Sequence, residues 1–429
     1  MIQLTAGKQR PLQMKKLPIN LVLSYSSTLI GFLIVLVLAR ILGAKDFSWV
    51  ALGLAIGGFI VPLFNLGSDR TFVRDAVAQK HVNVIDEMVL SNLSQRTFML
   101  LPISIALLGI TMVFTIEISD AVALIGFSLW AGLIGLYPAS WFDYSHDVRR
   151  HNLIVLGERG VCLLLICALY SLADKAPEIL TIGMCLLTTR VLSIFLQVRA
   201  WWVHHSSIPF SIRFLPVRQN QNGVNLHITI ATVANAFLTY GNQLLLASNA
   251  NPIELSSYSL AFQMMVIVFL FQGQAIRLSS RSIMEACRSR KAFLQSMAHN
   301  AGILFVGSTI LACGAWIAIQ ILPHILADAR FVTMSKIALP LCIWVVIAGV
   351  GFGISQHSLA LEQERFFLLT SLAGACTALL LGSLFIPHYG ALAVAVILLI
   401  VHSSMMLINT IWLVYSINVK DSWGCLERS

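Results

Sequence analysis

Long hydrophobic runs separated by short polar connections dominate the chain from residue 19 onward. A run of about 20 apolar residues can cross the hydrocarbon core of a bilayer as a helix, because a helix satisfies its own backbone hydrogen bonds there. The chain is therefore predicted to be an all-α integral membrane protein. The pattern predicts twelve spans, at Ile19–Leu38, Phe47–Leu66, Thr97–Ile116, Ala121–Trp141, Leu153–Leu172, Ile179–Val198, Leu226–Ala247, Leu255–Ile276, Ala301–Leu322, Ile337–Ile354, Phe366–Ile386 and Ala391–Tyr415.

The first hydrophobic run is predicted to be a spanning helix rather than a cleavable signal peptide. It is longer than the 7–15 residues of a typical signal-peptide core. Arg40 follows it, where a signal peptide would carry small residues at a cleavage site. The run is expected to stay in the membrane.

Composition supports a membrane environment for the whole chain. Of 429 residues, 58% are apolar and 11% are charged, whereas a soluble domain carries about 25% charged residues. The net charge of +9 does not point to nucleic acid, because the basic residues stand in short clusters between apolar runs. No nucleic-acid partner is expected.

Most of the 28 Lys and Arg residues fall in alternate connections between the spans. The positive-inside rule places those connections, and with them both termini, in the cytoplasm. An even number of spans follows. The longest connection divides the chain into a six-helix bundle over 1–198, a cytoplasmic linker over 199–225 and a second six-helix bundle with a short tail over 226–429.

Motifs for enzymatic or metal chemistry are absent from the sequence. The eight cysteines form no CxxC pair, and no P-loop, GxSxG or HExxH motif occurs, so no metal site, cofactor or built-in ATPase is expected. The outer connections are too short for the external loops of a glycan polymerase or ligase. The sequence therefore favours a protein that is not an enzyme.

Polar residues within the spans carry the most information, because each costs free energy in a bilayer and usually faces the bundle interior or a wet cavity. Two interpretations are open: the amides line a cavity, or they form hydrogen bonds between helices. The candidate cavity-lining residues are Asn235, Thr239 and Asn242, which share one helix face with Thr232, and Gln263 and Gln274 of the next span.

Arginines form two similar pairs at the cytoplasmic ends of spans. Arg70 with Arg74, and Arg277 with Arg281, are spaced four residues apart and share a helix face. They are candidates for a cationic cavity mouth that binds an anionic substrate. Asp69 beside the first pair is a candidate for ion coupling.

Two further arginines, Arg159 and Arg190, fall inside predicted spans. In one interpretation they add positive potential to the cavity wall, where arginine binds phosphate bidentately. In the other, Arg159 pairs with its neighbour Glu158, or the arginines extend to the membrane interface. Trp49, Trp141, Trp201 and Trp202 near span ends are predicted to be interfacial anchors.

Two hairpins resemble a known family. Ala39-Arg-Ile-Leu-Gly-Ala-Lys-Asp-Phe-Ser-Trp49, followed by Ala51-Leu-Gly-Leu-Ala and Asn65-Leu-Gly-Ser-Asp69, is similar to the first hairpin of polysaccharide exporters. Tyr240-Gly-Asn-Gln-Leu-Leu-Leu-Ala247, followed by Leu255-Ser-Ser-Tyr-Ser-Leu-Ala261, resembles the corresponding hairpin of the second half. The resemblance is to the O-antigen (Wzx-type) flippases of the multidrug/oligosaccharidyl-lipid/polysaccharide (MOP) exporter superfamily.

This resemblance implies two six-helix bundles around a cationic central cavity and transport by alternating access. The implied activity moves oligosaccharide units on undecaprenyl pyrophosphate, for O-antigen of lipopolysaccharide or a related surface polysaccharide, across the bacterial inner membrane. Implied partners are this lipid-linked substrate, membrane lipids, H⁺ or Na⁺ as coupling ion, and polysaccharide polymerase or chain-length proteins. The alternatives are a drug or small-solute antiporter and, less favoured, a membrane polysaccharide polymerase or ligase.

Overall fold

The chain folds into a bundle of membrane-length helices. The structure is a computed structural model, and it contains no β-strand within the residues that it describes. Those residues are 10–65, 82–114, 117–144, 147–172, 178–204, 222–249, 251–287, 289–326, 331, 333–361 and 363–419.

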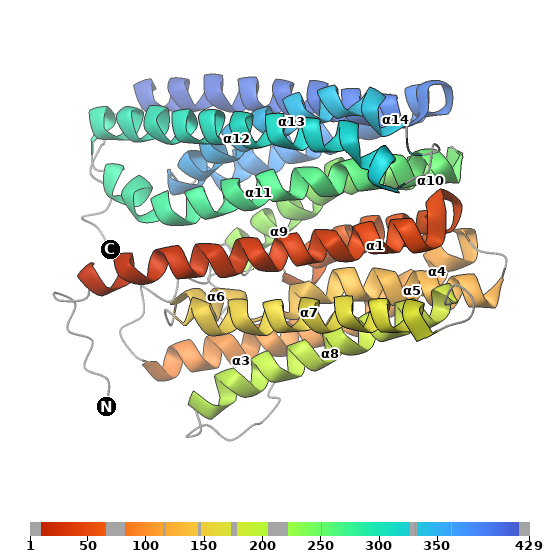
Figure 1. Ribbon diagram of the computed structural model, residues 1–429. Helices are drawn as coiled ribbons and strands as arrows, with labels where there is room; N and C mark the ends of the chain where they lie inside the picture. The colour runs from red at the N-terminus through yellow and green to blue at the C-terminus, as the bar shows by residue number, and fades with distance from the viewer. Residues whose placement is uncertain are drawn as a thin grey trace.

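Two helices are each long enough to cross the bundle twice. Helix α1 (Arg10–Asn65) turns back at Gly43, where φ is 70°, and helix α14 (Glu364–Val419) turns back at Gly390, where φ is 54°. Glycine occupies both bends because a residue without a Cβ adopts positive φ at no steric cost. Both bends lie at the end of the bundle opposite to the start of α1 and the end of α14 (Figure 1). We call these the kink end and the terminal end.

The remaining helices complete the two halves. The N-terminal half contains, with the first helix, α3 (Val82–Phe98), α4 (Leu100–Phe114), α5 (Ile118–Gly132), the 3₁₀ turn η1 (Leu133–Leu136), α6 (Ala139–Tyr144), α7 (Val148–Leu172) and α8 (Ile179–His204). The C-terminal half contains, with the last helix, α9 (Asn222–Ala236), the π-turn η2 (Phe237–Gly241), α10 (Asn242–Asn249), α11 (Pro252–Ala286), α12 (Arg290–Leu326) and α13 (Thr333–Ala360).

Twelve crossings follow from this arrangement. Within the described chain, eight helices are long and apolar enough to cross a membrane, and the kinks in α1 and α14 make two of them double. The consecutive helices α3 and α4 form one further crossing, and α9, η2 and α10 form another. An even number of crossings brings the start of α1 and the end of α14 to the same end of the bundle (Figure 1).

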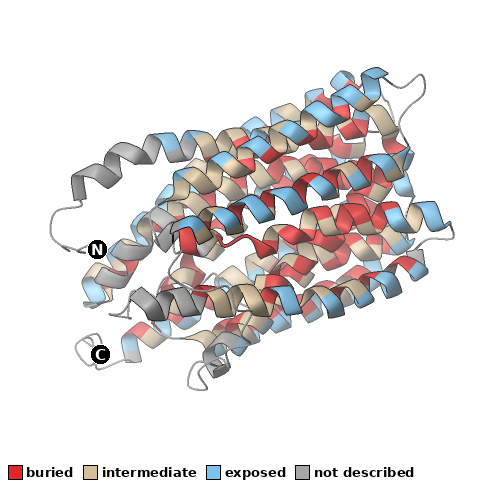
Figure 2. Ribbon diagram, turned by 90° about the horizontal axis from the view of Figure 1, so that it is seen from below, coloured by how far each residue is buried: buried red, intermediate tan, exposed pale blue. Residues whose placement is uncertain are grey.

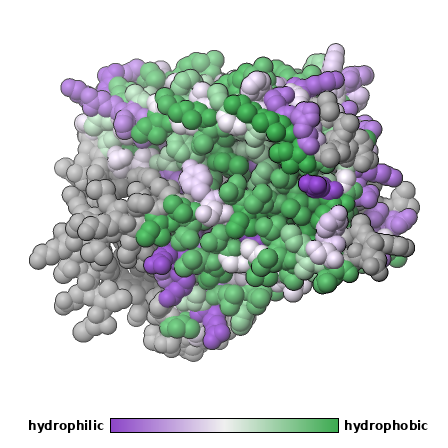
Figure 3. Space-filling model, in the orientation of Figure 1, coloured by the Kyte–Doolittle hydropathy of each residue, from purple (hydrophilic) through white to green (hydrophobic). Residues whose placement is uncertain are grey.

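The outer surface of the bundle is apolar. Met112, Leu164 and Ile310 are 80%, 71% and 67% exposed, which would be unfavourable in water and matches a lipid environment. Hydrophobic residues cover the middle of the helices and hydrophilic residues lie toward their ends (Figure 3). Buried residues are concentrated between the helices (Figure 2). The protein is a multi-pass membrane protein.

The two halves meet through α1. It lies between the other helices of the N-terminal half and those of the C-terminal half (Figure 1). In the described chain, every pair of elements in extensive contact across the halves includes α1, which contacts α9, η2, α10 and above all α11. On its other side α1 contacts α5 and α7. This helix therefore carries the interface between the halves.

The interface is closed toward the kink end. The Ser256 hydroxyl of α11 donates a buried hydrogen bond of 2.5 Å to the Ala44 carbonyl oxygen beside the α1 kink. Nearer the middle, the ring of Tyr240 lies so close to Gly58 that a Cβ there would be 2.4 Å from it. Gly58 thus permits the halves to approach through η2.

Two details differ from the sequence predictions. Helix α8 continues to His204 and α9 begins at Asn222, so both ends of the predicted linker are helical. Trp141 and Trp201 do not face lipid as interfacial anchors, because they are only 3% and 1% exposed and pack with Phe142 in one cluster.

Candidate functional site

A buried ion pair joins the middle of α7 to α8. The Arg190 guanidinium lies 3.2 Å from the Glu158 carboxylate, and these side chains are 4% and 1% exposed. Arg190 also donates a 2.9 Å hydrogen bond from Nε to the Trp130 carbonyl oxygen of α5. A charge in a low-dielectric interior is tolerated only when it is paired and hydrogen-bonded. Glu158 therefore pairs with Arg190 across helices rather than with its neighbour in the chain.

Tyr137 completes this network. Its hydroxyl donates to Glu158 Oε2 at 2.5 Å and accepts from Arg190 Nη1 at 2.6 Å. The Arg190 guanidinium also lies 5.4 Å from the centre of the Tyr137 ring. Buried Arg96 of α3 donates to the Tyr137 carbonyl oxygen at 2.9 Å, near the C-terminal end of η1, where a positive charge is favourable. The network thus connects α3, η1, α7 and α8.

Arg159 points away from this network toward α1. Successive residues of a helix point about 100° apart, so Glu158 and Arg159 reach different neighbours. The Arg159 guanidinium donates a 2.5 Å hydrogen bond to the Ser27 carbonyl oxygen, and a Cβ at Gly31 would be 2.9 Å from its Nη1. The ion pair of Glu158 fixes one face of α7, and Arg159 presents a cation on the other face.

A line of polar contacts extends from Arg159 across α1 to the C-terminal half. The Ser27 hydroxyl donates to the Ser24 carbonyl oxygen at 3.0 Å. Gln274 of α11 donates to Ser24 Oγ at 3.4 Å, which joins the two halves on the terminal side of the bundle. We call Arg159, Ser27, Ser24 and Gln274 the seam site.

The paired arginines of the second half belong to the same helix as Gln274. Arg277 follows it by about one helical turn and Arg281 by about two, and both lie within α11. Their side-chain positions lie outside the described part of the structure. The corresponding residues of the first half, Asp69, Arg70 and Arg74, also lie outside the described residues.

The amide-rich face of the seventh span packs inside the C-terminal half. Asn235 donates to Ser371 Oγ of α14 at 2.9 Å, and Asn242 is buried against Gly382 of the same helix. The Thr239 hydroxyl donates to the Asn235 carbonyl oxygen in its own helix. The structure places these residues between α9–α10 and α14, while Gln263 is half-buried in α11.

The seam site has the chemistry of an anion-binding surface. Arg190 and Glu158 neutralise each other in their ion pair. The half-buried Arg159 therefore contributes one net positive charge to this group of three residues, and its guanidinium faces α1. A guanidinium has five N–H donors in a planar fork that fits phosphate oxygens. No group of three or more His, Cys, Asp or Glu residues in the described chain is placed to hold a metal ion.

Sequence reasoning selected Arg159 and Gln274 but missed the residues between them. Ser24 and Ser27 stand in a polar run, Ser24-Tyr-Ser-Ser27, inside the first span, and that run was the available signal. It also missed Gln272, which is buried and donates to Ser308 Oγ and the Val345 carbonyl oxygen at 3.0 and 2.8 Å. Gln272 joins α11 to α12 and α13.

Comparison with known proteins identifies the fold. No protein-family model and no curated protein matches the sequence. An inward-facing multidrug resistance MATE family transporter of the MOP superfamily has 13% identity and a TM-score of 0.70, with 92% of this chain and 96% of that chain covered. Lipid II flippase MurJ in an inward closed conformation has 13% identity and a TM-score of 0.64, with 93% and 87% covered. These likenesses confirm the predicted fold, which is that of MOP-superfamily exporters.

A third solved structure has the same fold. An outward-facing MATE transporter of the MOP superfamily has 13% identity and a TM-score of 0.58, with 96% of both chains covered.

Proposed function

We propose that this protein is a flippase for lipid-linked oligosaccharides. It moves repeat units of O-antigen or a related surface polysaccharide, carried on undecaprenyl pyrophosphate, from the cytoplasmic to the outer leaflet of the bacterial inner membrane. The observation that carries the proposal is the placement of Arg159, a cation with no ion-pair partner among the described residues, on a polar seam between the two halves of an exporter fold.

The chemistry of the seam site fits the head of such a substrate. Arg159 would bind an oxygen of the diphosphate, and Arg277, about one turn beyond Gln274, would add positive charge near the terminal end. The hydroxyl of Ser24 and the amide of Gln274 are groups that hydrogen-bond sugar hydroxyls. The prenyl chain would remain in the lipid beside the protein, because hydrocarbon gains nothing from entering a polar site.

Transport would proceed by alternating access driven by an ion gradient. In the present arrangement the kink end is closed by the contact of Ser256 with Ala44. The positive-inside rule assigns the terminal end to the cytoplasm, so substrate would enter from the cytoplasmic leaflet once the contact of Gln274 with Ser24 on that side separates. Asp69 stays the candidate for ion coupling, with H⁺ or Na⁺ as the ion.

The comparisons support two kinds of transporter, a flippase for lipid-linked cargo and a drug or small-solute antiporter. The name of one similar structure, lipid II flippase MurJ, refers to a lipid-linked cargo, which favours the flippase. Other similar structures are multidrug resistance transporters, which keeps a drug or small-solute antiporter as the second candidate. An uncompensated guanidinium suits an anionic cargo, and this property places the flippase first.

Deletion of the gene in its host tests the proposed substrate. We expect loss of surface polysaccharide together with accumulation of single lipid-linked repeat units on the cytoplasmic side, measured after extraction of undecaprenyl-linked glycans. Single units that reach the surface unpolymerised would instead assign a polymerase. An unchanged glycan profile in a host without a second flippase would assign a small-solute antiporter.

Substitution of Arg159 tests the seam site. Arg159→Ala is expected to lower export about tenfold or more, because a hydrogen bond to a charged group contributes roughly 1.5–3 kcal/mol. Arg159→Lys should restore part of it, since lysine keeps the charge but not the fork. Arg150 lies on the same helix as Arg159 and forms an ion pair with Asp147, which directly precedes that helix. Arg150→Ala is the matched control and should export normally. Full export by Arg159→Ala at normal protein levels would contradict the site.

A further inference from the structure

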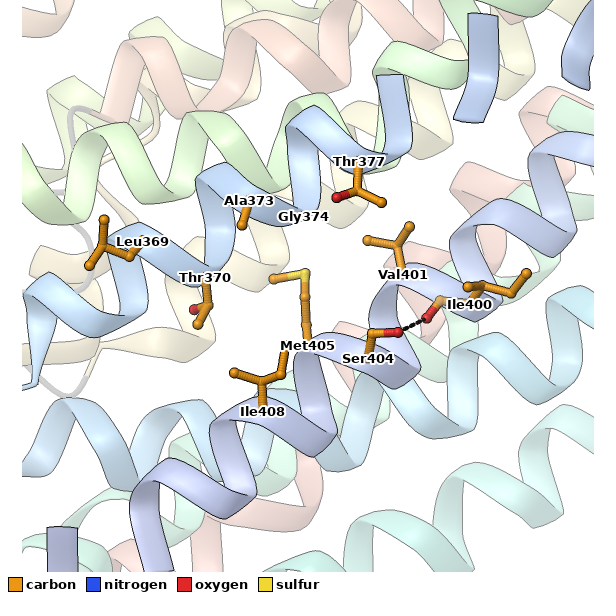
Figure 4. Close-up of a pocket in the computed structure, with 10 residues that line it drawn as sticks. All are labelled: Leu369, Thr370, Ala373, Gly374, Thr377, Ile400, Val401, Ser404, Met405 and Ile408. Carbon is orange, nitrogen blue, oxygen red and sulfur yellow. Dashed lines mark hydrogen bonds between the residues drawn. The ribbon is translucent and has the colours of Figure 1, made fainter. Parts of the chain in front are cut away.

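An apolar groove lies between the two arms of α14 (Figure 4). Its volume is about 310 Å³, which falls at the lower end of the range for sites that bind small organic ligands. Its walls come from both arms, which are separated in sequence by the kink at Gly390. The lining residues are Leu369, Thr370, Ala373, Gly374, Thr377, Ile400, Val401, Ser404, Met405 and Ile408.

The groove opens to the outside of the bundle. Leu369, Ile400 and Ile408 on its rim are 64%, 50% and 50% exposed. Its floor is closed by Gly374 and Met405, since a Cβ at Gly374 would be 2.4 Å from the Met405 sulfur. The missing side chain at Gly374 thus lets Met405 pack directly against the first arm. The exposed rim continues into the apolar surface that faces lipid.

The groove offers little to a polar ligand. The Thr370 hydroxyl donates to the Phe366 carbonyl oxygen at 3.1 Å, and the Ser404 hydroxyl donates to the Ile400 carbonyl oxygen at 2.9 Å (Figure 4). These two hydroxyls are therefore satisfied within their own helical arms. Thr377 contributes the third hydroxyl of the lining, and the other seven lining residues are apolar. Among the residues that the structure describes, no charged one lines the groove. A lining of this composition favours a hydrocarbon chain as the ligand.

The position of the groove along α14 selects one leaflet. The arms join at Gly390 at the kink end. The lining residues nearest to this kink are Thr377 of the first arm and Ile400 of the second, 13 and 10 residues from it. At 1.5 Å per residue these separations are roughly 20 and 15 Å, so the groove begins at about the middle of a hydrocarbon core that is roughly 30 Å thick. The groove therefore lies in the half of the membrane on the terminal side, which the positive-inside rule assigns to the cytoplasmic leaflet.

We infer that this groove binds one acyl chain of a phospholipid from the cytoplasmic leaflet. The rim is continuous with the lipid-facing surface, and phospholipid acyl chains are the hydrocarbon that surrounds that surface. Small residues on the walls, Ala373, Gly374 and Ser404, allow a chain to lie close to both arms, so dispersion contacts form on several sides. The inference does not depend on the cargo that the protein transports.

Photo-crosslinking in lipid nanodiscs tests the inference. The purified full chain is reconstituted with a phospholipid that carries a diazirine near the middle of one acyl chain, and adducts are mapped by peptide mass spectrometry. We expect a several-fold higher adduct yield at the lining residues than on equally exposed Val306 and Ile310 of α12, which are 56% and 67% exposed.

A groove-filling variant supplies the second measurement. Ala373→Phe places a ring into the hollow from the wall and should lower the adduct yield several-fold. Cys376→Phe adds the same ring to the exposed surface of the same arm outside the groove, and it should leave the yield unchanged.

Three results would overturn the assignment. Equal adduct yields at the groove residues and on α12 would mean that the groove contacts only bulk lipid and has no specific site for an acyl chain. Loss of the adducts when undecaprenyl phosphate is added would assign the groove to a prenyl chain. Protection from labelling only in a dimer of the protein would assign it to a second copy of this chain.

Discussion

The Ser256 hydroxyl donates a 2.5 Å hydrogen bond to the Ala44 carbonyl oxygen, so the first turns of α11 hold the kink of α1. Two residues earlier, Glu254 accepts a 3.0 Å hydrogen bond from the backbone N–H of Ala391, next to the kink of α14. One segment at the start of α11 thus contacts both bends of the chain. The contact with α1 crosses the two halves, whereas the contact with α14 stays within one half.

A cross-link between the halves at the kink end should stop transport. Cysteines at positions 44 and 256, in a background that lacks the eight native cysteines, would be joined by oxidation or by a short thiol cross-linker. Because alternating access must separate the halves at this end, we expect export to fall to background and to return after reduction or with the uncross-linked protein.

A pair within one half is the matched control for this cross-link. Gln363, directly before α14, donates to Ser416 Oγ of α14 at 2.7 Å, so both residues belong to the C-terminal half. Cysteines at 363 and 416 should cross-link equally well without loss of export. Continued export with positions 44 and 256 fully cross-linked would show that the halves do not separate there.

Removal of one partner from the buried ion pair should destabilise the protein strongly. Arg190→Met leaves the Glu158 carboxylate buried without its counter-charge, and breaking such a pair costs about 3–5 kcal/mol. We expect a large loss of thermal stability in detergent, measured by the temperature at which the protein aggregates or loses its near-UV signal.

Two variants separate this effect from a general loss of charge. Arg190→Met with Glu158→Gln removes both charges and should recover most of the lost stability, because no uncompensated ion remains. Asp147→Asn removes the ion pair with Arg150, whose side chains are 34% and 42% exposed, and should cost less than about 1 kcal/mol. Equal losses for the buried and exposed pairs would contradict our assignment.

A methyl group at Gly31 should displace Arg159 without unfolding the protein. The added Cβ would be 2.9 Å from Nη1 of a flexible side chain, so the guanidinium can move away, but it leaves Ser27. We expect Gly31→Ala to lower export at normal protein levels. Gly160→Ala, next to Arg159 but with open space around its Cβ position, should export like the unmodified protein. If Gly31→Ala exported normally and Gly160→Ala did not, this role of Gly31 would be refuted.

Substitution of Gly390 should destabilise the last helical pair. Its φ of 54° is unfavourable for other residues, at a cost of about 1–3 kcal/mol, and a Cβ there would be 1.8 Å from Glu254 Oε2. Gly390→Ala should therefore lower the thermal unfolding temperature. Gly109→Ala, inside α4 with nothing near its Cβ position, should raise stability by roughly 0.5–1 kcal/mol. A neutral Gly390→Ala would show that the kink is not fixed.

Much of the fold could be predicted because the membrane makes helix length and hydrophobicity nearly sufficient signals. Each predicted span overlaps observed helices. The span predicted at Ala121–Trp141 is not one continuous helix, because it passes from α5 through η1 and the non-helical Tyr137 and Pro138 into α6. The sequence did not reveal the buried position of Trp201, which packs with Val89 and Trp141. From sequence alone, a tryptophan near a span end is interpreted as an interfacial anchor. Only the positions of the neighbouring helices show that they bury its side chain.

The candidate site was less predictable, because partners in space depend on helix rotation. Glu158 stands next to Arg159 in sequence, yet its partner is Arg190, 32 residues away. The regular spacing of Asn235 and Asn242 is interrupted by η2, a π-turn that shifts the helix face. Both amides then meet α14 inside one half, an outcome that periodicity alone cannot distinguish from cavity lining.

The position of α1 also has a consequence for biosynthesis. This helix is made before α11, and its hydrogen-bonding partners there are 212 residues away for Ala44 and 250 residues away for Ser24. At about 5–20 residues per second of synthesis, roughly 10 to 50 s pass before α11 emerges from the ribosome. During that interval the face of α1 that α11 later covers, with Ser24 on it, lies against lipid or an insertion factor. The nascent N-terminal half therefore stays in the membrane without the C-terminal half during this interval.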